Sequence, residues 1–191
     1  MKIMEDIAAY VPYNEQEEKD REHILAFLKA NDDAFLRENR TAHMTASAWI
    51  VNRDRTRVLM CYHKIYDSWS WTGGHADGDT DLLRVALKEA GEETGITRVR
   101  PVSEEIYSLE VLTVDGHEKR GEYVSGHLHM NVTYLLEADD TEELSACEEE
   151  NSGVRWFSLD EALRASTEPW FVSRIYAKLN AKLAEEPYKG C

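Results

Sequence analysis

The 191-residue sequence predicts a layered α/β domain preceded by a helical extension. Apolar residues recur with helical spacing near both ends and once in the middle, and strand-like runs lie between these segments. We see no internal repeat and no clear linker. We therefore expect an N-terminal helical extension at residues 1–40 and one α/β domain at residues 41–191.

Composition narrows the classes of protein. Hydrophobic residues make up 42% of the chain and charged residues 31%, which is an ordinary globular balance. No apolar run approaches the length of a membrane span, and the acidic N-terminus does not resemble a signal peptide. Three scattered cysteines indicate free thiols in a reducing compartment. We expect a cytoplasmic protein with no membrane partner.

The charge of the chain bears on its partners. The formal net charge of −15 disfavours binding to nucleic-acid backbones, which need a basic face. An acidic protein can still bind a small phosphate-containing substrate when metal cations lie between the two. We therefore expect a small-molecule phosphate ligand and no nucleic acid.

The N-terminal residues predict one or two helices over 14–39. Asn14 followed by Glu17 is a candidate capping box at the start. An apolar stripe with helical spacing follows at Ile24, Leu25, Leu28 and Phe35. The polar run 31–33 favours a break into two pieces. These helices either pack on the domain or build a homodimer.

Strand-like runs occupy most of the middle of the chain. They lie at residues 43–51, 56–63, 99–113, 128–137 and 154–157. The segment 64–80, rich in Trp, Gly and Asp, is interpreted as a loop. Residues 81–94 have helical periodicity, with Gly95 as the C-terminal stop.

The C-terminal part predicts a loop and two helices. An acidic loop covers residues 139–150. Ser158 with Glu161 forms a second candidate capping box. Pro169 suits the first turn of the last helix.

Three glutamates share one face of the helix predicted at residues 81–94. On a helical wheel the buried stripe is formed by Leu83, Ala86, Leu87 and Ala90. A separate face carries Glu89, Glu92 and Glu93. Such close carboxylates repel one another unless a cation lies among them, and oxygen ligands suit Mg²⁺ or Mn²⁺. Taken alone, the same residues also fit an ordinary solvated helix face.

Residues 74–96 resemble the Nudix box, a motif of one glycine, a first glutamate and a run Arg-Glu-apolar-any-Glu-Glu-any-Gly-apolar at fixed spacing. The matching residues are Gly74, Glu89, Ala90, Glu92, Glu93, Gly95 and Ile96. Two positions depart, because Thr80 replaces the first glutamate and Lys88 replaces the arginine. The flanks agree with the family too, with Trp71 before the glycines and an acidic loop leading into Trp156.

The resemblance implies an α/β/α sandwich with a mixed β-sheet and a Mg²⁺- or Mn²⁺-dependent hydrolase. Its reaction would cleave a diphosphate bond in a nucleoside diphosphate linked to another group. The implied metal ligands are Glu89, Glu92, Glu93 and the carbonyl of Gly74. The implied base is an acidic residue from a later loop, for which Glu149 and Glu150 are the candidates.

The two departures bear on activity. Lysine is a compact charge, whereas arginine can grip a carboxylate with a planar fork. Lys88 can still pair with Glu92 one turn later. Thr80 removes one carboxylate, and Thr80 or Asp79 suits the N-cap of the helix. These changes favour weak or specialised activity.

Several residues outside the glutamate cluster are candidates for binding the substrate. His127 and His129 alternate with apolar residues along a strand, whose polar side either lines a pocket or is an ordinary half-exposed face. Tyr66 and Trp71 either stack on a base or pack under the loop. His75 is a candidate for contact with phosphate, and Lys88 completes the set.

Two other functions stay open. A non-catalytic Nudix-like module that senses a nucleotide is supported by Thr80 and Lys88. An isopentenyl-diphosphate isomerase-like enzyme would need a cysteine, for which Cys61 is the candidate. For a hydrolase, the open substrates are ADP-ribose, dinucleotide polyphosphates, nucleoside triphosphates and nucleotide sugars.

Overall fold

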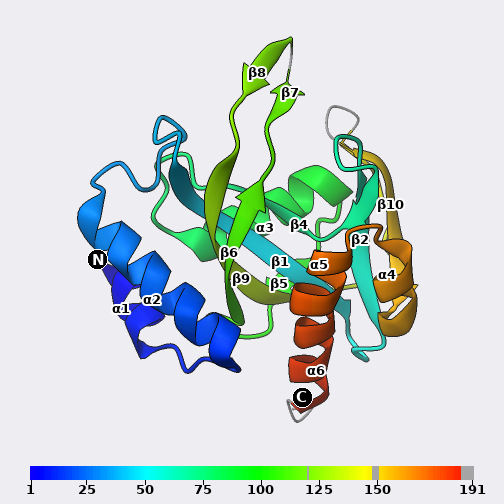
Figure 1. The fold of residues 1–191 in the computed structure, drawn as a ribbon. Coiled ribbons are helices and arrows are strands. Elements are labelled where there is room, and N and C mark those ends of the chain that lie inside the picture. The colour runs from blue at the N-terminus through cyan, green and yellow to red at the C-terminus, as the bar shows by residue number, and fades with distance from the viewer. Residues whose placement is uncertain (120, 148–150, 186–191) are drawn as a thin grey trace. The chain divides into compact units, whose positions relative to one another are not determined.

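The computed structural model describes residues 1–119, 121–147 and 151–185 (Figure 1). The described chain divides into two compact units. The first consists of Met1–Ser47, Gly73–Ala86 and Glu104–Tyr134, and the second of Ala48–Thr72, Leu87–Ser103 and Leu135–Cys191. The predicted boundary between residues 40 and 41 is not tested by this division and stays a prediction.

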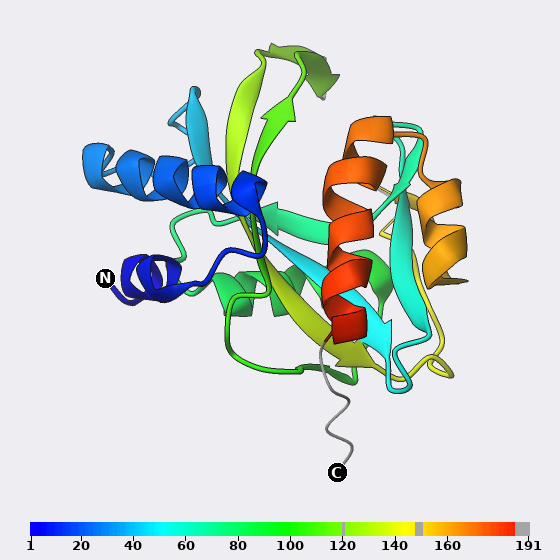
Figure 2. The ribbon, with the colours of Figure 1, turned by 60° about the horizontal axis from the view of Figure 1, so that its bottom comes forward.

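The first unit begins with helices α1 (Lys2–Ala9) and α2 (Glu15–Ala30), which lie side by side in both views (Figures 1 and 2). The sequence analysis missed α1, because only Ile3 and Ile7 mark its buried face. Helix α2 ends before residues 31–33, where the sequence predicted a break, but residues 34–39 form turns and not the second helical piece. Helix α2 packs on strand β6 (Ser108–Val114) of the same chain, while a homodimer stays a prediction.

The start of α2 departs from the predicted capping box. The Asn14 side chain accepts a hydrogen bond from the Glu17 N–H at 2.9 Å, as an N-cap should. The Glu17 carboxylate, however, accepts from the N–H of Tyr13 at 2.7 Å and from the hydroxyl of Tyr10 at 2.6 Å. Glu17 is buried, so its carboxylate serves the contact between α2 and the strands as well as the cap.

The strands of the first unit form both antiparallel and parallel pairs. Strand β6 runs antiparallel to β9 (His127–Ala138), with Glu110 opposite Asn131. Strand β1 (Ala42–Asn52) runs parallel to β9, since the Leu128 N–H donates to the Thr41 carbonyl and Ser47 reaches Asn131 further along both strands. The sheet is therefore mixed, as predicted. The hydrogen-bonded order along the sheet is β10 (Asn151–Ser158), β2 (Arg57–His63), β1, β9 and β5 (Val99–Pro101), and it includes strands of both units.

A buried polar network fills one face of the first unit's strands. We call it the Asn131 network, and its members are Glu17, Thr45, Ser47, Ser108, Glu110, Asn131 and Thr133. Ser108 donates to Glu17 at 2.7 Å and also contacts Glu110. The polar side of β9 at Asn131 and Thr133 is thus fully buried, which neither sequence interpretation anticipated.

Strands of the second unit surround β2 (Arg57–His63). It pairs antiparallel with β1, β3 (Ser68–Ser70) and β10 (Asn151–Ser158). Strand β5 (Val99–Pro101) pairs antiparallel with β9. The register of β1 and β2 places Ile50 opposite Leu59, and both side chains are fully buried.

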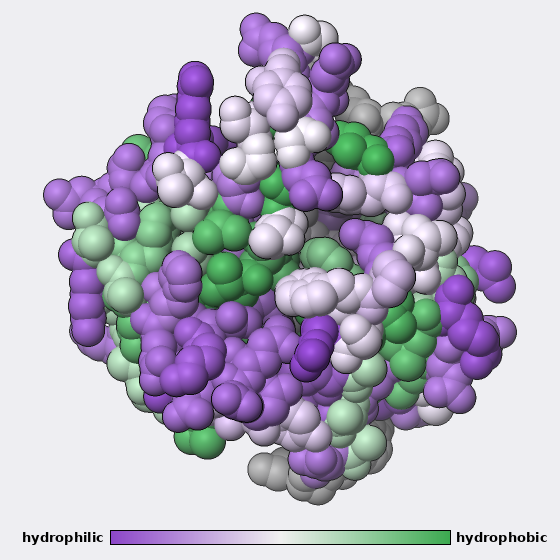
Figure 3. Space-filling view, in the orientation of Figure 1, coloured by the Kyte–Doolittle hydropathy of each residue, from purple (hydrophilic) through white to green (hydrophobic). Residues whose placement is uncertain are grey.

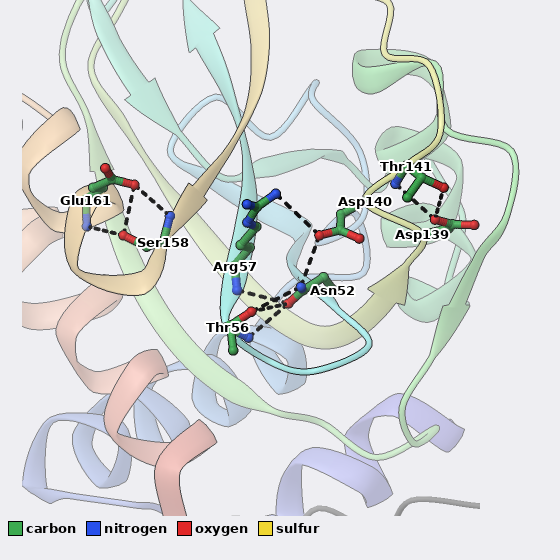
Figure 4. A network of polar contacts seen from close by, with 8 residues as sticks. All are labelled: Asn52, Thr56, Arg57, Asp139, Asp140, Thr141, Ser158 and Glu161. Atoms are coloured by element: carbon green, nitrogen blue, oxygen red, sulfur yellow. Dashed lines mark hydrogen bonds and ion pairs between the residues drawn. The ribbon is translucent and has the colours of Figure 1, made fainter.

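Side chains close the turns of the second unit (Figure 4). The Asn52 side-chain oxygen accepts from the N–H groups of Thr56 and Arg57, both at 2.9 Å, and so fixes the turn between β1 and β2. The predicted capping box of Ser158 and Glu161 is present at the start of helix α4 (Leu159–Ala165).

Aromatic side chains mediate the packing of the C-terminal helix. It starts with α5 (Pro169–Phe171), passes through a π-helical segment at Val172–Tyr176 and continues as α6 (Ala177–Glu185). Tyr176 is fully buried and stacks on Trp49 with 5.3 Å between ring centroids. Such pairs add about 0.5–1.5 kcal/mol beyond the area that they bury.

The structure corrects the loop predicted at residues 64–80. That segment contains β3 and also β4 (Thr72–His75), which pairs with β1. Strands β7 (His117–Lys119) and β8 (Glu122–Val124) form an extended hairpin arm that the sequence analysis missed (Figures 1 and 2). All are three or four residues long, too short for a periodic signal, so distant pairing rather than local pattern defines them.

Hydrophilic side chains predominate on the face drawn in Figure 3, with smaller hydrophobic patches between them. This surface agrees with a sequence in which charged residues make up 31% of the chain. Across residues 1–119, 121–147 and 151–185 we find no helix long and apolar enough to cross a bilayer.

The Asn131 network predicts the effect of one hydroxyl. Ser108→Ala should lower the free energy of unfolding by about 1–3 kcal/mol, because two buried carboxyl groups lose the hydroxyl that contacts both of them. Urea unfolding followed by circular dichroism measures this change. Ser152→Ala, at an exposed serine in β10, is the matched control and should stay within about 0.5 kcal/mol of the wild type. Equal stability of the two variants would contradict the role of Ser108.

Candidate functional site

The glycine-rich loop lies against the backbone of β1. A β-carbon placed on Gly73 would lie 2.5 Å from the Ser47 hydroxyl oxygen and 2.7 Å from the Ala46 carbonyl oxygen, so only glycine fits there. One step further along, the Ala76 N–H donates to the Met44 carbonyl at 3.1 Å. The predicted metal ligand Gly74 sits in β4 between these two anchor points.

Helix α3 (Leu82–Thr94) starts at a cap other than the predicted one. The Asp81 carboxylate accepts from the Arg84 N–H at 3.1 Å, which is the N-cap contact. Asp79 instead accepts from the Asp81 N–H at 2.9 Å and pairs with the Arg84 guanidinium. The predicted caps Thr80 and Asp79 are therefore wrong, and the helix starts one residue later.

The buried stripe of α3 also differs from the predicted one. The buried apolar residues are Leu82, Val85, Ala86 and Ala90, whereas Leu83 and Leu87 are half-buried. Because the stripe is rotated, Glu93 falls on the buried side and is only 6% exposed. The three glutamates thus lie in different environments.

Lys88 joins two of the three glutamates. Its ammonium group donates to Glu92 at 2.8 Å and to Glu89 at 3.1 Å. These hydrogen bonds, the one to Glu92 first, raise the pKa of Lys88, so the lysine stays charged. A lysine at the arginine position of the box therefore still neutralises part of the carboxylate charge.

Glu93 is held from two sides. The Asn151 amide donates to its carboxylate at 3.1 Å, and the Cys61 thiol lies 3.7 Å from its backbone carbonyl. Burial, followed by the charge of Glu93, raises the pKa of the Cys61 thiol. Cys61 is therefore a protonated thiol inside the unit. Glu149 and Glu150, the predicted bases, lie outside the described residues.

Four histidines of the first unit converge. We call them the histidine cluster, and they are His43 of β1, His75 of β4 and His127 and His129 of β9. Each offers one ring nitrogen, and these nitrogens all lie within 4.8 Å of one another. The sequence analysis named three of the four as substrate-binding candidates without predicting that they meet.

The sequence analysis missed His43 altogether. The residue begins a polar row on β1 that continues with Thr45 and Ser47 at period two. The alternation of this row is visible in the sequence, but the strand that pairs with it is not. The parallel pairing of β1 with β9 brings the row beside His127 and His129.

Two imidazole rings of the histidine cluster have lowered pKa values and so favour their uncharged form. Burial first, and then the charges of neighbouring histidines, lower the pKa of His129 to about 2. Burial also lowers the pKa of His43. Beside them, Arg37 grips Asp77 with two hydrogen bonds, which lower the pKa of that carboxyl. The negative charge of Asp77 is thus paired with the positive charge of Arg37 beside the imidazoles.

The aromatic candidates have different surroundings. Trp71 is 8% exposed and packs edge-on against Phe171 and Tyr176. Tyr66 is 41% exposed and lies against the His63 ring at 4.7 Å between centroids. The structure therefore gives Trp71 a packing role, and substrate contact stays a prediction for both.

Comparisons with known proteins agree on one family. A family model described as the NUDIX domain matches residues 41–179. The chain is also similar to the asymmetrical bis(5'-nucleosyl)-tetraphosphatase of Rattus norvegicus, with 30% identity over 95 residues, 49% of this chain and 58% of that relative. The chain thus spans less than two thirds of the relative's length.

Two solved structures resemble the chain. One is a C. elegans Ap4A hydrolase binary complex, with a TM-score of 0.52, 18% identity and coverage of 74% of this chain and 94% of that chain. The other is RenU, a Nudix hydrolase from M. smegmatis, with a TM-score of 0.54, 15% identity and coverage of 76% and 88%. At these identities the likeness concerns the fold.

The packing of the glycine-rich loop generates a stability prediction. Gly73→Ala should destabilise the protein by about 1–3 kcal/mol, because the methyl group meets backbone and Ser47 at contact distances that force a shift. Gly91→Ala, inside α3 and with ordinary contact at 3.5 Å, is the matched control. It should be neutral or stabilise by up to about 1 kcal/mol. Thermal melts compare the two, and a Gly73→Ala melt at the wild-type temperature would refute the close approach.

Proposed function

Because the chain belongs to the Nudix family, we propose that it is a metal-dependent hydrolase that cleaves a diphosphate bond in a nucleoside diphosphate linked to another group. The family match covers most of the chain and agrees with the resemblance of residues 74–96 and with the predicted α/β fold class. The cleavage of a diphosphate bond, the metal dependence and the substrate are our proposals, and the family match supports the first of them.

One observation carries the proposal most directly. Lys88 bonds to both Glu89 and Glu92, while Glu93 is held in place by Asn151. The box therefore presents carboxylates whose positions are fixed by neighbours, as a metal site requires. Carboxylate oxygens are the ligands that Mg²⁺ and Mn²⁺ prefer, so these residues fit the cation that the family implies.

Each residue of the box has a proposed role. Glu89, Glu92, Glu93 and the Gly74 carbonyl would hold Mg²⁺ or Mn²⁺. When bound, the cation offsets charge on the diphosphate oxygens and lowers the pKa of water. A carboxylate takes the proton of the attacking water, with Glu149 and Glu150 as further candidates for this role. Lys88 positions Glu92 and contacts the substrate phosphate.

The substrate class remains a proposal built on the relatives. Two of the similar proteins are named for the hydrolysis of dinucleoside tetraphosphates. We propose a dinucleotide polyphosphate as the first substrate to test, ahead of ADP-ribose, nucleoside triphosphates and nucleotide sugars. Tyr66 and Trp71 are the proposed contacts to its base. A cytoplasmic location stays a prediction.

A nucleotide sensor is the second candidate function. It is favoured by one observation, since the Lys88 ammonium occupies two of the carboxylates that a catalytic cation needs. A sensor would bind nucleotide without releasing product. In a hydrolase, the catalytic cation would have to displace Lys88 from Glu89 or from Glu92.

The glutamates give the decisive activity prediction. Glu93→Gln and Glu92→Gln keep side-chain size but remove a charge, so turnover of a nucleotide panel with Mg²⁺ or Mn²⁺ should fall by more than about 100-fold. Glu18→Gln, on the exposed side of α2, is the control and should leave turnover unchanged. Circular dichroism checks that all variants fold. Near-normal turnover by folded Glu93→Gln would show that the metal assignment is wrong.

The departures from the box give a prediction that separates hydrolase from sensor. For a hydrolase, restoring the pattern with Lys88→Arg and Thr80→Glu should change the rate by only about tenfold, or ~1.4 kcal/mol in the barrier. The measurement is a single-turnover assay with excess protein. Saturable binding with no product from the wild type, and new activity in the double variant, would support the sensor instead.

A further inference from the structure

We propose that the histidine cluster is a binding site for a borderline transition-metal cation, with Zn²⁺ as the type ligand. The site is formed by His43, His75, His127 and His129 alone, and its ligands are separate from the glutamates of the Nudix box. The inference does not depend on the proposed hydrolase activity.

The geometry of the cluster suits one small cation. Five of the ring pairs have centroids 4.9–5.0 Å apart. The Nε2 atoms of His127 and His129 are 3.1 Å apart. Zn²⁺ binds imidazole nitrogen at about 2.0–2.1 Å in tetrahedral sites, which places neighbouring ligand atoms about 3.3 Å apart. The rings are therefore already gathered at close to the spacing of a four-ligand site.

Backbone carbonyls select the tautomer that a metal needs. His43 Nδ1 lies 3.0 Å from the Asn39 carbonyl, and His127 Nδ1 lies 2.9 Å from the Ser125 carbonyl. A carbonyl oxygen can only accept, so each Nδ1 carries the proton and each Nε2 presents a lone pair. Metal-bound histidines characteristically donate their other ring nitrogen in this way.

One of these lone pairs is buried. The Nε2 atom of His43 has no hydrogen-bond partner within the part of the chain that the structure describes, and its side chain is 4% exposed. A buried polar atom without a partner is costly, and buried acceptors are almost always satisfied. A cation in the cluster would satisfy His43 together with the other three rings.

The kind of ligand atom in the histidine cluster indicates which class of cation it would bind. Neutral imidazoles suit Zn²⁺, Co²⁺, Ni²⁺ and Cu²⁺, whereas Mg²⁺ prefers oxygen ligands. All four ligand atoms that the cluster offers are imidazole nitrogens, so the donor set matches this class of cation.

The site has a structural consequence for the Nudix box. His75 ends β4, in the glycine-rich loop, while the other ligands lie on β1 and β9. A bound cation would therefore tie the loop to both strands, and we infer that it rigidifies the loop from which the box begins.

Titration of the purified, chelator-treated full chain tests the site. Zn²⁺ should bind with a stoichiometry of one at the cluster, raise the melting temperature and resist competition by excess Mg²⁺. Co²⁺ should give the visible absorption of a tetrahedral nitrogen-ligated ion. His129→Ala and His127→Ala should each weaken Zn²⁺ binding by more than about 100-fold, beyond what outer-shell changes cause.

Two controls keep the test independent of folding and of the glutamates. His23→Ala, at an exposed histidine of α2, should bind Zn²⁺ like the wild type. Glu92→Gln should also bind Zn²⁺ normally, even if it abolishes turnover. Because His127 is less buried than His43, His127→Ala is the variant expected to keep its fold, which circular dichroism checks. Unchanged Zn²⁺ affinity in folded His127→Ala, or Zn²⁺ binding lost in Glu92→Gln, would overturn the proposal.

Discussion

The side-chain amide of Asn131 holds three strands of the first unit in register. Its oxygen accepts from the hydroxyls of Thr45 and Ser47 on β1, both at 2.9 Å. Its nitrogen donates to Glu110 on β6, also at 2.9 Å. An amide buried with both its donor and its acceptor satisfied tolerates no slip of a strand, because a one-residue shift would leave these groups unpaired. This single side chain therefore fixes the parallel pair β1–β9.

The same register of β1 and β9 also determines where the histidines of the first unit lie. Side chains two residues apart lie on one face of a strand, so the row that contains Asn131 continues to His129 and His127. The matching row on β1 continues from Thr45 to His43. One end of this face is a satisfied polar core, and the other is a set of four imidazoles in which Nε2 of His43 has no hydrogen-bond partner among the described residues. The proposed cation would satisfy this second end as the hydrogen bonds satisfy the first.

Some local signals in the sequence predicted local features. The capping box of Ser158 and the stop at Gly95 depend on spacing along one helix, which the sequence displays, whereas the N-cap of α3 was misplaced by one residue or more. Features that depend on distant pairing were missed or misplaced. Glu93 is buried because of the way α3 packs on the rest of its unit, which a helical wheel cannot show. His43 lies beside His127 because β1 pairs in parallel with β9, which is far away in the sequence.

We propose two classes of cation site, with hard cations at the carboxylates of the box and borderline cations at the imidazoles of the histidine cluster. Anomalous diffraction from crystals soaked in turn with Mn²⁺ and with Zn²⁺ tests this division most directly. We expect a Mn²⁺ peak bounded by Glu89, Glu92 and Glu93, and a Zn²⁺ peak bounded by the four histidines. A single peak shared by both ions, or a Mn²⁺ peak at the histidines with none at the glutamates, would contradict it.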